Sequence, residues 1–290
     1  ELFATQFNAL DGGGANVGIY VDGFYSPNPL AVEFDLLNVT GIQVLKGPQG
    51  TLFGRNTTGG AILVSTGKPS TQDAATLQLS YGRFNTWMLR GSANAALSDT
   101  TAIRLNAMTG GGDGDTFNRV LNKRVNGTRT TGFRGAFRYK PSDDLDINIA
   151  ADWARGNQNG RYGFDVSGIL RPPADSVYIS STGTVMRNIG KAWGVNGTID
   201  WKVNDALSFK SITAYRETTQ NYNLELTDQP VSLYTVYTDN VSKQFTQEFQ
   251  LSGTAANDRL NYVAGLYFFS ERSDAFIGDY IFSSVFFRKD

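Results

Sequence analysis

From about residue 74 onward, apolar and polar side chains alternate along successive short segments, and this alternation limits the possible folds more than any other feature. Neighbouring side chains of a β-strand point to opposite faces of a sheet, so alternation predicts strands with one apolar face. The clearest apolar face consists of Trp87, Leu89, Gly91, Ala93, Ala95 and Leu97. The residues between them form a largely polar face: Met88, Arg90, Ser92, Asn94 and Ala96.

The pattern recurs at about 103–107, 133–140, 145–153 and 193–203, where the charged side chains fall on the polar face. Further strands are expected at about 206–217, 240–252 and 258–272. The segments are near the ~10-residue length of a tilted strand that crosses a membrane. Together they predict roughly nine strands of a partial transmembrane antiparallel β-barrel, with charge on its inward face.

The connections between these segments support the same architecture. Short polar turns are expected at 97–100, 141–144, 204–205 and 256–258, and they alternate with long connections at about 112–128, 157–189 and 218–240. Outer-membrane barrels have short periplasmic turns and longer extracellular loops, so the long connections are expected outside the cell. The aromatic residues expected at the two membrane interfaces are Trp87, Tyr139, Trp153, Trp201, Tyr215 and Tyr262. The alternative to an interface role for each residue is that aromatic residues simply favour β-strands.

Composition excludes most familiar enzyme sites. The 290 residues include no cysteine and no histidine, which rules out disulfides, Cys/His zinc sites, histidine-ligated haem and a Ser-His-Asp triad. The formal net charge of -1 gives no electrostatic basis for binding nucleic acid. No apolar run approaches the ~18 residues of a spanning helix. We therefore expect no enzyme, no cofactor, no metal site and no nucleic-acid partner.

Residues 1 to about 70 do not alternate over long spans, so they are expected to form a small α+β globule rather than wall. Strands are predicted at 18–21, 42–45 and 61–64, with a proline-containing loop at 25–30 and a short helix or turn at 32–37. The stretch GIQVLKGPQGTLFGRNTTGGAILVSTGK, residues 41–68, is rich in glycine and predicts a tight connection with close backbone approach. It lacks the residue order of a phosphate-binding P-loop, and a generic glycine-rich loop is the simpler alternative.

The glycine-rich stretch closely resembles the plug signature of TonB-dependent outer-membrane receptors. The matching residues are LKGPQGTLFG at 45–54 and GGAI at 59–62, with YVDGFY at 20–25 upstream and QEFQLS at 247–252 and VAGLY at 263–267 downstream. The resemblance implies that residues 1–70 are the C-terminal part of a plug domain. Residues 71–290 would then be the N-terminal part of a siderophore-receptor-like barrel of ~22 strands, a width that needs a plug. The first half of the plug, the TonB box and the remaining strands are expected to lie outside this sequence.

The resemblance implies TonB-dependent active import of a scarce bulky nutrient across the bacterial outer membrane, with a ferric siderophore as the leading substrate. Cobalamin, oligosaccharides and plant-derived aromatic compounds are alternatives within the class. The implied partners are outer-membrane lipid, the imported ferric chelate and the TonB-ExbB-ExbD complex, the last through an absent N-terminal segment. A passive porin lacks the plug, and a secreted all-β enzyme or adhesin has no reason to carry an apolar outer band.

The resemblance also implies contacts between plug and wall. The signature loop comprises Lys46, Gly47, Pro48, Gly50, Gly54, Arg55, Gly59 and Gly60. Its cations Lys46 and Arg55 are expected to pair with Glu248, which alternation places on the inward face. Gln43 stands where the family usually has Glu, so a full four-charge cluster of the family's kind is not expected. The alternative for Glu248 is a solvated carboxylate in the lumen.

Ligand-binding residues are harder to predict. Phe24, Tyr25, Pro27 and Pro29 form a candidate plug apex facing the ligand, with packing against the wall as the alternative. Asp113 and Asp115 could offer oxygen ligands to Ca²⁺, but two carboxylates without further ligands fit a solvated hairpin tip better.

Overall fold

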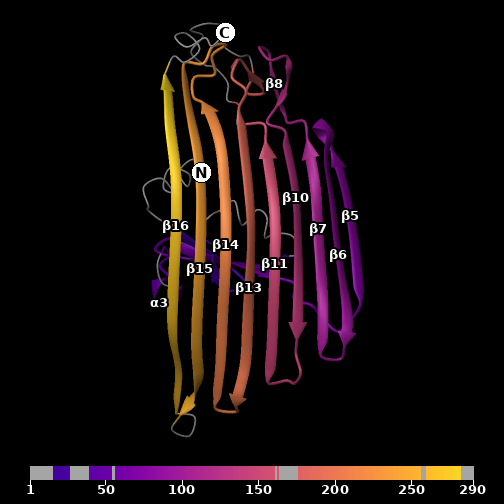
Figure 1. Cartoon of the computed structure of the whole chain (residues 1–290), viewed down its shortest axis with the longest axis vertical. Coiled ribbons are helices and arrows are strands. Elements are labelled where there is room, and N and C mark those ends of the chain that lie inside the picture. The colour runs from indigo at the N-terminus through magenta and orange to yellow at the C-terminus, as the bar shows by residue number, and fades with distance from the viewer. Residues whose placement is uncertain are drawn as a thin grey trace.

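The computed structural model describes residues 16–26, 39–53, 56–160, 162, 176–255 and 259–281. Within these ranges the chain is almost entirely β-structure, arranged as one large curved sheet with a small sheet behind it. The large sheet is the partial barrel wall, and the small sheet is the plug (Figure 1). No helix in the described part of the chain is long and apolar enough to cross a membrane.

The wall is an antiparallel sheet of nine strands in the order β16-β15-β14-β13-β11-β10-β7-β6-β5. In chain order its strands are β5 (Ala74–Gly82), β6 (Thr86–Ser98), β7 (Thr101–Gly112), β10 (Thr128–Tyr139), β11 (Leu145–Gln158), β13 (Arg187–Asn204), β14 (Leu207–Glu225), β15 (Tyr234–Ala255) and β16 (Leu260–Ile281). The predicted fold class and strand number are confirmed. The last strands are much longer than predicted, reaching 22 residues in β15 and β16.

The extra length explains one wrong prediction. The connection expected at 218–240 is only residues 226–233, because β14 continues to Glu225 and β15 begins at Tyr234. Residues 218–225 pair with β15 as regularly as the rest of the strand. They read Thr-Thr-Gln-Asn-Tyr-Asn-Leu-Glu, so the apolar-polar alternation used for prediction fades while the backbone ladder continues.

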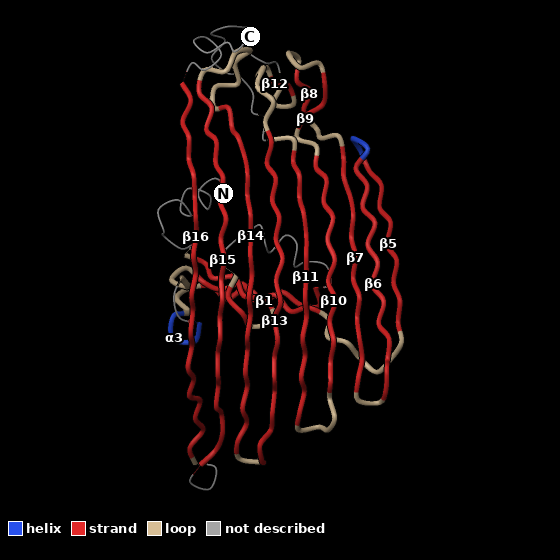
Figure 2. The backbone as a smooth tube through the Cα atoms, in the orientation of Figure 1, coloured by secondary structure: helices blue, strands red, loops and turns tan. Residues whose placement is uncertain are grey.

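The long connections gather at one end of the wall and the short turns at the other (Figures 1 and 2). The long ones carry a further small sheet of β8 (Thr116–Asn118), β9 (Lys123–Val125) and β12 (Ile179–Ser180). The alternation of short and long is not strict, since β5 and β6 are joined at the long-loop end by the 3₁₀ turn Arg83–Asn85. The predicted turn at 256–258 lies outside the described residues.

The two faces of the wall differ as the sequence predicts. On β10 the outward Phe133 is 52% exposed while the neighbouring inward Arg134 is 3% exposed. Aromatic side chains gather in pairs on the outward face, including Phe133 against Trp153 and Trp193 against Tyr215. Phe209 stacks on Phe249 nearer the short turns. The outward face is thus an apolar band with aromatic pairs, as lipid contact requires.

The plug sheet has the order β2-β1-β4-β3 and lies across the wall strands behind them in Figures 1 and 2. Its strands are β1 (Val17–Val21), β2 (Phe24–Tyr25), β3 (Val39–Lys46) and β4 (Gly60–Thr66). β1 and β4 run parallel, and the short helix α3 (Gly50–Phe53) lies in the glycine-rich connection. The three predicted plug strands are confirmed, and the helix or turn expected at 32–37 falls outside the described residues.

Candidate functional site

The turn between β1 and β2 carries the acidic residue that joins the plug to the wall. Asp22 and Gly23 form a two-residue hairpin turn with φ of 48° and 91°. Positive φ at both central residues is the geometry of a type I′ turn, which Asp-Gly favours. Thr66 then fixes the Asp22 carboxylate, since its backbone N and its Oγ1 donate to Oδ1 (2.8 Å) and Oδ2 (2.7 Å).

Four charges meet where this turn touches the inner face of the wall. Arg134 Nη2 lies 2.8 Å from Asp22 Oδ2, and Arg134 Nη1 lies 3.3 Å from Asp152 Oδ1. Arg216 Nη2 lies 3.0 Å from the same Asp152 oxygen. Among the described residues the cluster holds two arginines and two aspartates, and each of these charges has an opposite neighbour, which lowers the cost of its burial.

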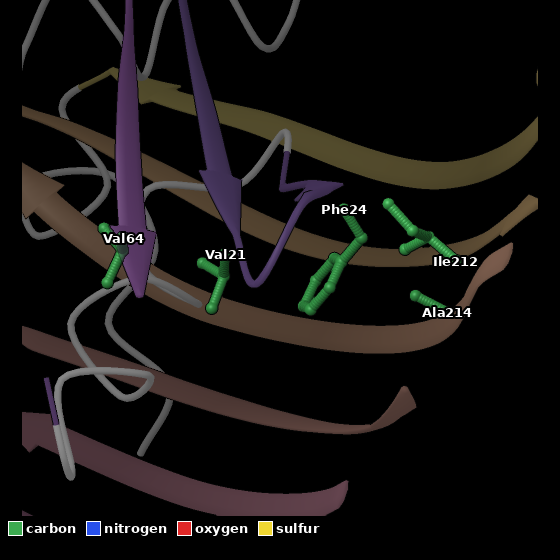
Figure 3. Packing of buried hydrophobic residues seen from close by; sticks show 5 residues of the cluster. All are labelled: Val21, Phe24, Val64, Ile212 and Ala214. Carbon is green, nitrogen blue, oxygen red and sulfur yellow. The ribbon is translucent and has the colours of Figure 1, made fainter. Parts of the chain in front are cut away.

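Beside the charges, apolar side chains from both sheets share a core. Val21, Phe24 and Val64 of the plug pack with Ile212 and Ala214 of β14, as Figure 3 shows. The guanidinium of Arg216 lies 5.5 Å from the centre of the Phe24 ring, within cation-π range. The plug is therefore held by apolar burial and by charge at the same place on the wall.

A second contact is made one strand further along. Gln244 Nε2 of β15 donates to the carbonyl oxygen of Tyr25 at 2.7 Å. The Tyr25 ring lies 6.0 Å from the ring of Phe269 on β16 and 5.6 Å from that of Tyr20. These contacts extend the plug–wall interface over β14, β15 and β16.

The linker between plug and wall is also bound to the inner face. Asn94 accepts a hydrogen bond from the Ser70 backbone N and donates to the carbonyl oxygens of Ser70 and Gln72. Arg138 Nη1 donates to the Pro69 carbonyl oxygen at 3.1 Å while its Nε holds Asp146 at 2.8 Å. The chain is thus fastened to the wall before β5 begins.

On the long-loop side, the connections are tied together by buried polar groups. Asp228 accepts hydrogen bonds from Ser180 Oγ and from the backbone N of Ser181 and Thr182. Glu225 in turn accepts from the backbone N of Asp228 at 2.8 Å. Tyr162 Oη accepts from Met186 N, and burial raises the pKa of this phenol above its ordinary value. The bonds of Asp228 join residues 176–186 to residues 226–233.

Some glycines of the predicted signature loop stand where a side chain would clash or the backbone would be strained, and others stand in open space. Gly60 has φ of 149°, and a Cβ there would overlap the carbonyl oxygen of Leu45. Gly47 has φ of 82° in open space, and a Cβ on Gly59 would lie 3.3 Å from the Asn16 carbonyl oxygen. Gly50 has neither a positive φ nor a close neighbour, and Pro48 is exposed. Gly54 and Arg55 lie outside the described residues.

The predicted pairing of Lys46 with Glu248 is not formed. Alternation did place Glu248 correctly, since Gln244 on the same inward row of β15 reaches the plug. Glu248 Oε1 instead accepts a hydrogen bond from Gln250 Nε2 at 2.6 Å, and Lys46 is exposed. The physical reason is that the Asp22 turn, rather than the glycine-rich loop, meets the charged part of the wall. The Arg55 half of the prediction stays a prediction.

The candidate ligand-facing apex needs a correction at two positions. Phe24 and Tyr25 are 3% and 4% exposed, because the Phe24 ring packs on β14 and the Tyr25 ring packs on Phe269 of β16. This is the wall-packing alternative, so neither ring lies at an open apex. Pro27 and Pro29 lie outside the described residues. Asp113 accepts from Asn85 and Asp115 from Thr116, and the described residues hold no metal-binding group of carboxylates.

Sequence reasoning did not single out Asp22, Arg134, Asp152 and Arg216 as a site. Two signals pointed to it: Arg134 and Asp152 fall on the inward face by alternation, and Asp22 precedes a glycine at a hairpin turn. The sequence did not predict the position of the plug sheet against the wall, because no local sequence pattern encodes it.

Comparison with known proteins supports the architecture of a plug and a barrel wall. Residues 3–61 match the family model of the TonB-dependent receptor plug domain. The catecholate siderophore receptor Fiu of Escherichia coli K12 is 33% identical over 101 residues, which is 34% of this chain and 13% of Fiu. The probable TonB-dependent receptor BfrD of Bordetella pertussis is 26% identical over 225 residues, 71% of this chain and 28% of BfrD. The chain thus spans a minor part of these relatives.

Solved structures share the fold over nearly the whole chain. The ferric yersiniabactin uptake receptor FyuA of Yersinia pestis aligns with a TM-score of 0.73 and 19% identity, covering 92% of this chain and 41% of FyuA. The open form of the ferric-catecholate import receptor Fiu of E. coli K12 aligns with a TM-score of 0.71 and 18% identity, covering 90% of this chain and 43% of that one. At these identities the likeness shows the fold alone, a curved antiparallel wall with plug strands against its inner face.

Proposed function

We propose that this chain, a TonB-dependent siderophore-receptor-like protein of the bacterial outer membrane, takes part in active import of a ferric siderophore. The observation that carries the proposal is the plug itself, which is joined to the inner face of the wall by a buried core and a cluster of paired charges. A passive pore has no use for such a closure. An importer needs it, because the path must stay shut until ligand and energy are both present.

The ion pair between plug and wall suits a plug that moves during import and then returns to its position. Among the described residues, the Arg134–Asp22 pair links the two sheets, and Asp152 lies next to Arg134 and Arg216 within the wall. Moving the plug breaks this pair, while Asp152 stays next to both arginines and offsets part of their charge. Such an arrangement lowers the cost of opening, since no arginine is left buried without an acid.

Iron as the cargo is supported by the relatives, of which Fiu is described as a catecholate siderophore receptor. Cobalamin, oligosaccharides and aromatic compounds are the competing cargoes. In each case the substrate would be bound on the long-loop side, and energy would come from the TonB-ExbB-ExbD complex through a segment preceding the described plug strands.

The test is growth and uptake with the full-length receptor in a strain lacking its other siderophore receptors. We expect uptake of radioactive iron as a ferric catecholate, abolished when TonB is deleted. Equal uptake with and without TonB would refute active import. TonB-dependent uptake of cobalamin but not of any ferric chelate would refute the cargo while keeping the class.

A further inference from the structure

Three buried polar side chains lie on the inner face of the wall, on the short-turn side of the charge cluster at the plug turn. Asn148 belongs to β11, and Asn196 and Thr198 belong to β13. Their exposed fractions are 5%, 2% and 6%. Asn148 and Thr198 are direct cross-strand partners, and Asn196 is two residues beyond Gly194, which lies opposite Asp152. We call these three residues the inner polar group.

Within the described part of the chain, the inner polar group has side-chain atoms without a hydrogen-bond partner. These atoms are Nδ2 and Oδ1 of Asn196, Oδ1 of Asn148 and Oγ1 of Thr198. Buried polar atoms normally have partners, because an unsatisfied one costs free energy. Apolar side chains of similar shape would avoid this cost. The group is therefore suited to a polar partner that lies elsewhere in this arrangement of plug and wall.

The acidic turn of the plug lies next to the inner polar group. A Cβ added to Gly23 in that turn would lie 3.0 Å from Ile212 Cδ1, and Ile212 is the direct cross-strand partner of Thr198. Ala214, which belongs to the core shared by plug and wall (Figure 3), is the direct partner of Asn196. The carboxylate of the turn therefore needs only a short movement to reach the group.

The direction of that movement is toward the short turns. Along one face of a strand, residues two apart are separated by roughly 6 to 7 Å. On this side of the charge cluster, Asn196 is two residues and Thr198 four residues beyond Gly194. The short turns are at the periplasmic end of the proposed importer. A pull on the plug from the periplasm would thus carry Asp22 away from Arg134 and toward the inner polar group.

We propose that the inner polar group is a second binding position for the Asp22 carboxylate, occupied when the plug moves toward the periplasm. A carboxylate only accepts hydrogen bonds, and Asn196 Nδ2 and Thr198 Oγ1 are donors. The plug exchanges its ion pair with Arg134 for hydrogen bonds from neutral groups, so its acid gains new partners as it leaves the old one. The inference rests on the proposed function for the direction of movement.

The test measures the position of the plug in the full-length receptor, without cargo and without TonB. Spin labels are placed at Ser65→Cys on β4 and Lys123→Cys on the long-loop side, both exposed, in a background free of other cysteines. Arg134→Gln removes the ion pair of the plug. We then expect a second distance between the labels, longer by roughly 6 to 7 Å, in double electron–electron resonance. Adding Asn196→Leu and Thr198→Val should remove the longer distance.

Thr238→Val is the matched control, because Thr238 Oγ1 is also buried and without a partner among the described residues but lies on the long-loop side of the charge cluster. This change should leave the longer distance in place. Thr198→Ser keeps the hydroxyl and should also leave it in place. Heat-modifiable migration in gels shows that each variant is folded. A folded Arg134→Gln receptor without the longer distance, or its persistence after Asn196→Leu and Thr198→Val, would overturn the proposal.

Uptake by the full-length receptor tests whether the second position is used during import. Asn196→Leu/Thr198→Val should lower the TonB-dependent rate of ferric catecholate uptake by about tenfold, because the moved plug loses two donors. An unchanged rate would overturn a role for the second position in import. A receptor that shows the longer distance but takes up no ferric chelate with TonB would refute the proposed function and leave the second position standing.

Discussion

Arg134 and Asp22 are 112 residues apart in sequence, yet Arg134 Nη2 donates to Asp22 Oδ2 at 2.8 Å across the boundary between wall and plug. The Arg134 side chain is 3% exposed and the Asp22 side chain 15% exposed, so water screens the pair weakly. Thr66 Oγ1 lies 3.2 Å from the same guanidinium nitrogen and orients both partners. This pair is the natural place to test how firmly the plug is seated.

The first prediction concerns that pair. Asp22→Asn should weaken plug seating by about 3 kcal/mol, since it removes the charge that Arg134 faces in a buried place. We expect full-length receptors with this change to admit large antibiotics that the native receptor excludes. Arg134→Gln alone should behave similarly. The double variant should be less leaky than the sum of the two, and strict additivity in this cycle would show that the two residues do not interact.

The second prediction concerns the apolar part of the seat. Ile212→Ala removes side-chain atoms that pack on Val21 and Phe24, and it should cost about 2 to 4 kcal/mol. The loss should appear as a lower temperature for plug release, measured by protease cleavage of the plug below the melting temperature of the barrel. Ile199→Ala on the outward face is the matched control. Equal effects of the two changes would mean that Ile212 stabilises the wall alone.

The third prediction separates two glycines of the signature loop. Gly60→Val should destabilise the plug strongly, because φ is 149° and a Cβ would overlap the Leu45 carbonyl oxygen. Gly50→Val should be tolerated, because no atom lies within 4 Å of a Cβ there and φ is not positive. Folded yield and uptake by the full-length receptor measure both. Wild-type behaviour of the Gly60 variant would show that the β3–β4 register shifts to accommodate a side chain.

These contacts show how far sequence reasoning reaches. Alternation identified the nine strands and put Arg134, Asp152 and Glu248 on the inward face, because the period of a strand is a local property. It could not choose which inward residue meets the plug, because that depends on the position and rotation of a separate sheet. The expected charges were therefore reversed: the plug supplies the acid Asp22 and the wall supplies the arginines.

The strand ends were missed for a related reason. Alternation reports the lipid boundary, and β14 and β15 continue past it as a ladder with polar residues on both faces. A pattern built on hydrophobicity therefore marks where the membrane ends and not where the strand ends.

The fourth prediction concerns the long loops. Asp228→Ala removes the acceptor for Ser180 Oγ and for two backbone N–H groups, which should release residues 176–186 from residues 226–233. Hydrogen exchange at Ser181 and Thr182 should speed up by about tenfold or more as the loop opens locally. Asp239→Ala, which removes an exposed acceptor for Asn221, is the control. Unchanged protection at both amides would contradict the inferred tie.

The fifth prediction concerns pH. The hydrogen bond from Lys202 lowers the pKa of the exposed Asp205 carboxyl in the turn after β13. The pair's contribution to stability is thus present above the unfolded carboxyl pKa of about 3.9 and is lost as pH falls through the lower folded pKa. Lys202→Gln should return the Asp205 pKa to its ordinary value in an NMR titration. The lowered pKa of Asp143, held by Lys140, should stay where it is.

The hydrogen bonds from Asn94 and Arg138 hold the linker on the wall, so a pull on the plug reaches the linker before it reaches β5. Tension drawn along β4 from the plug meets the three hydrogen bonds of Asn94 at Ser70 and Gln72 before it reaches the first rung of β5. A pull on the plug is therefore carried by side chains of β6 and β10, in the interior of the sheet, and the first residues of β5 keep their pairing.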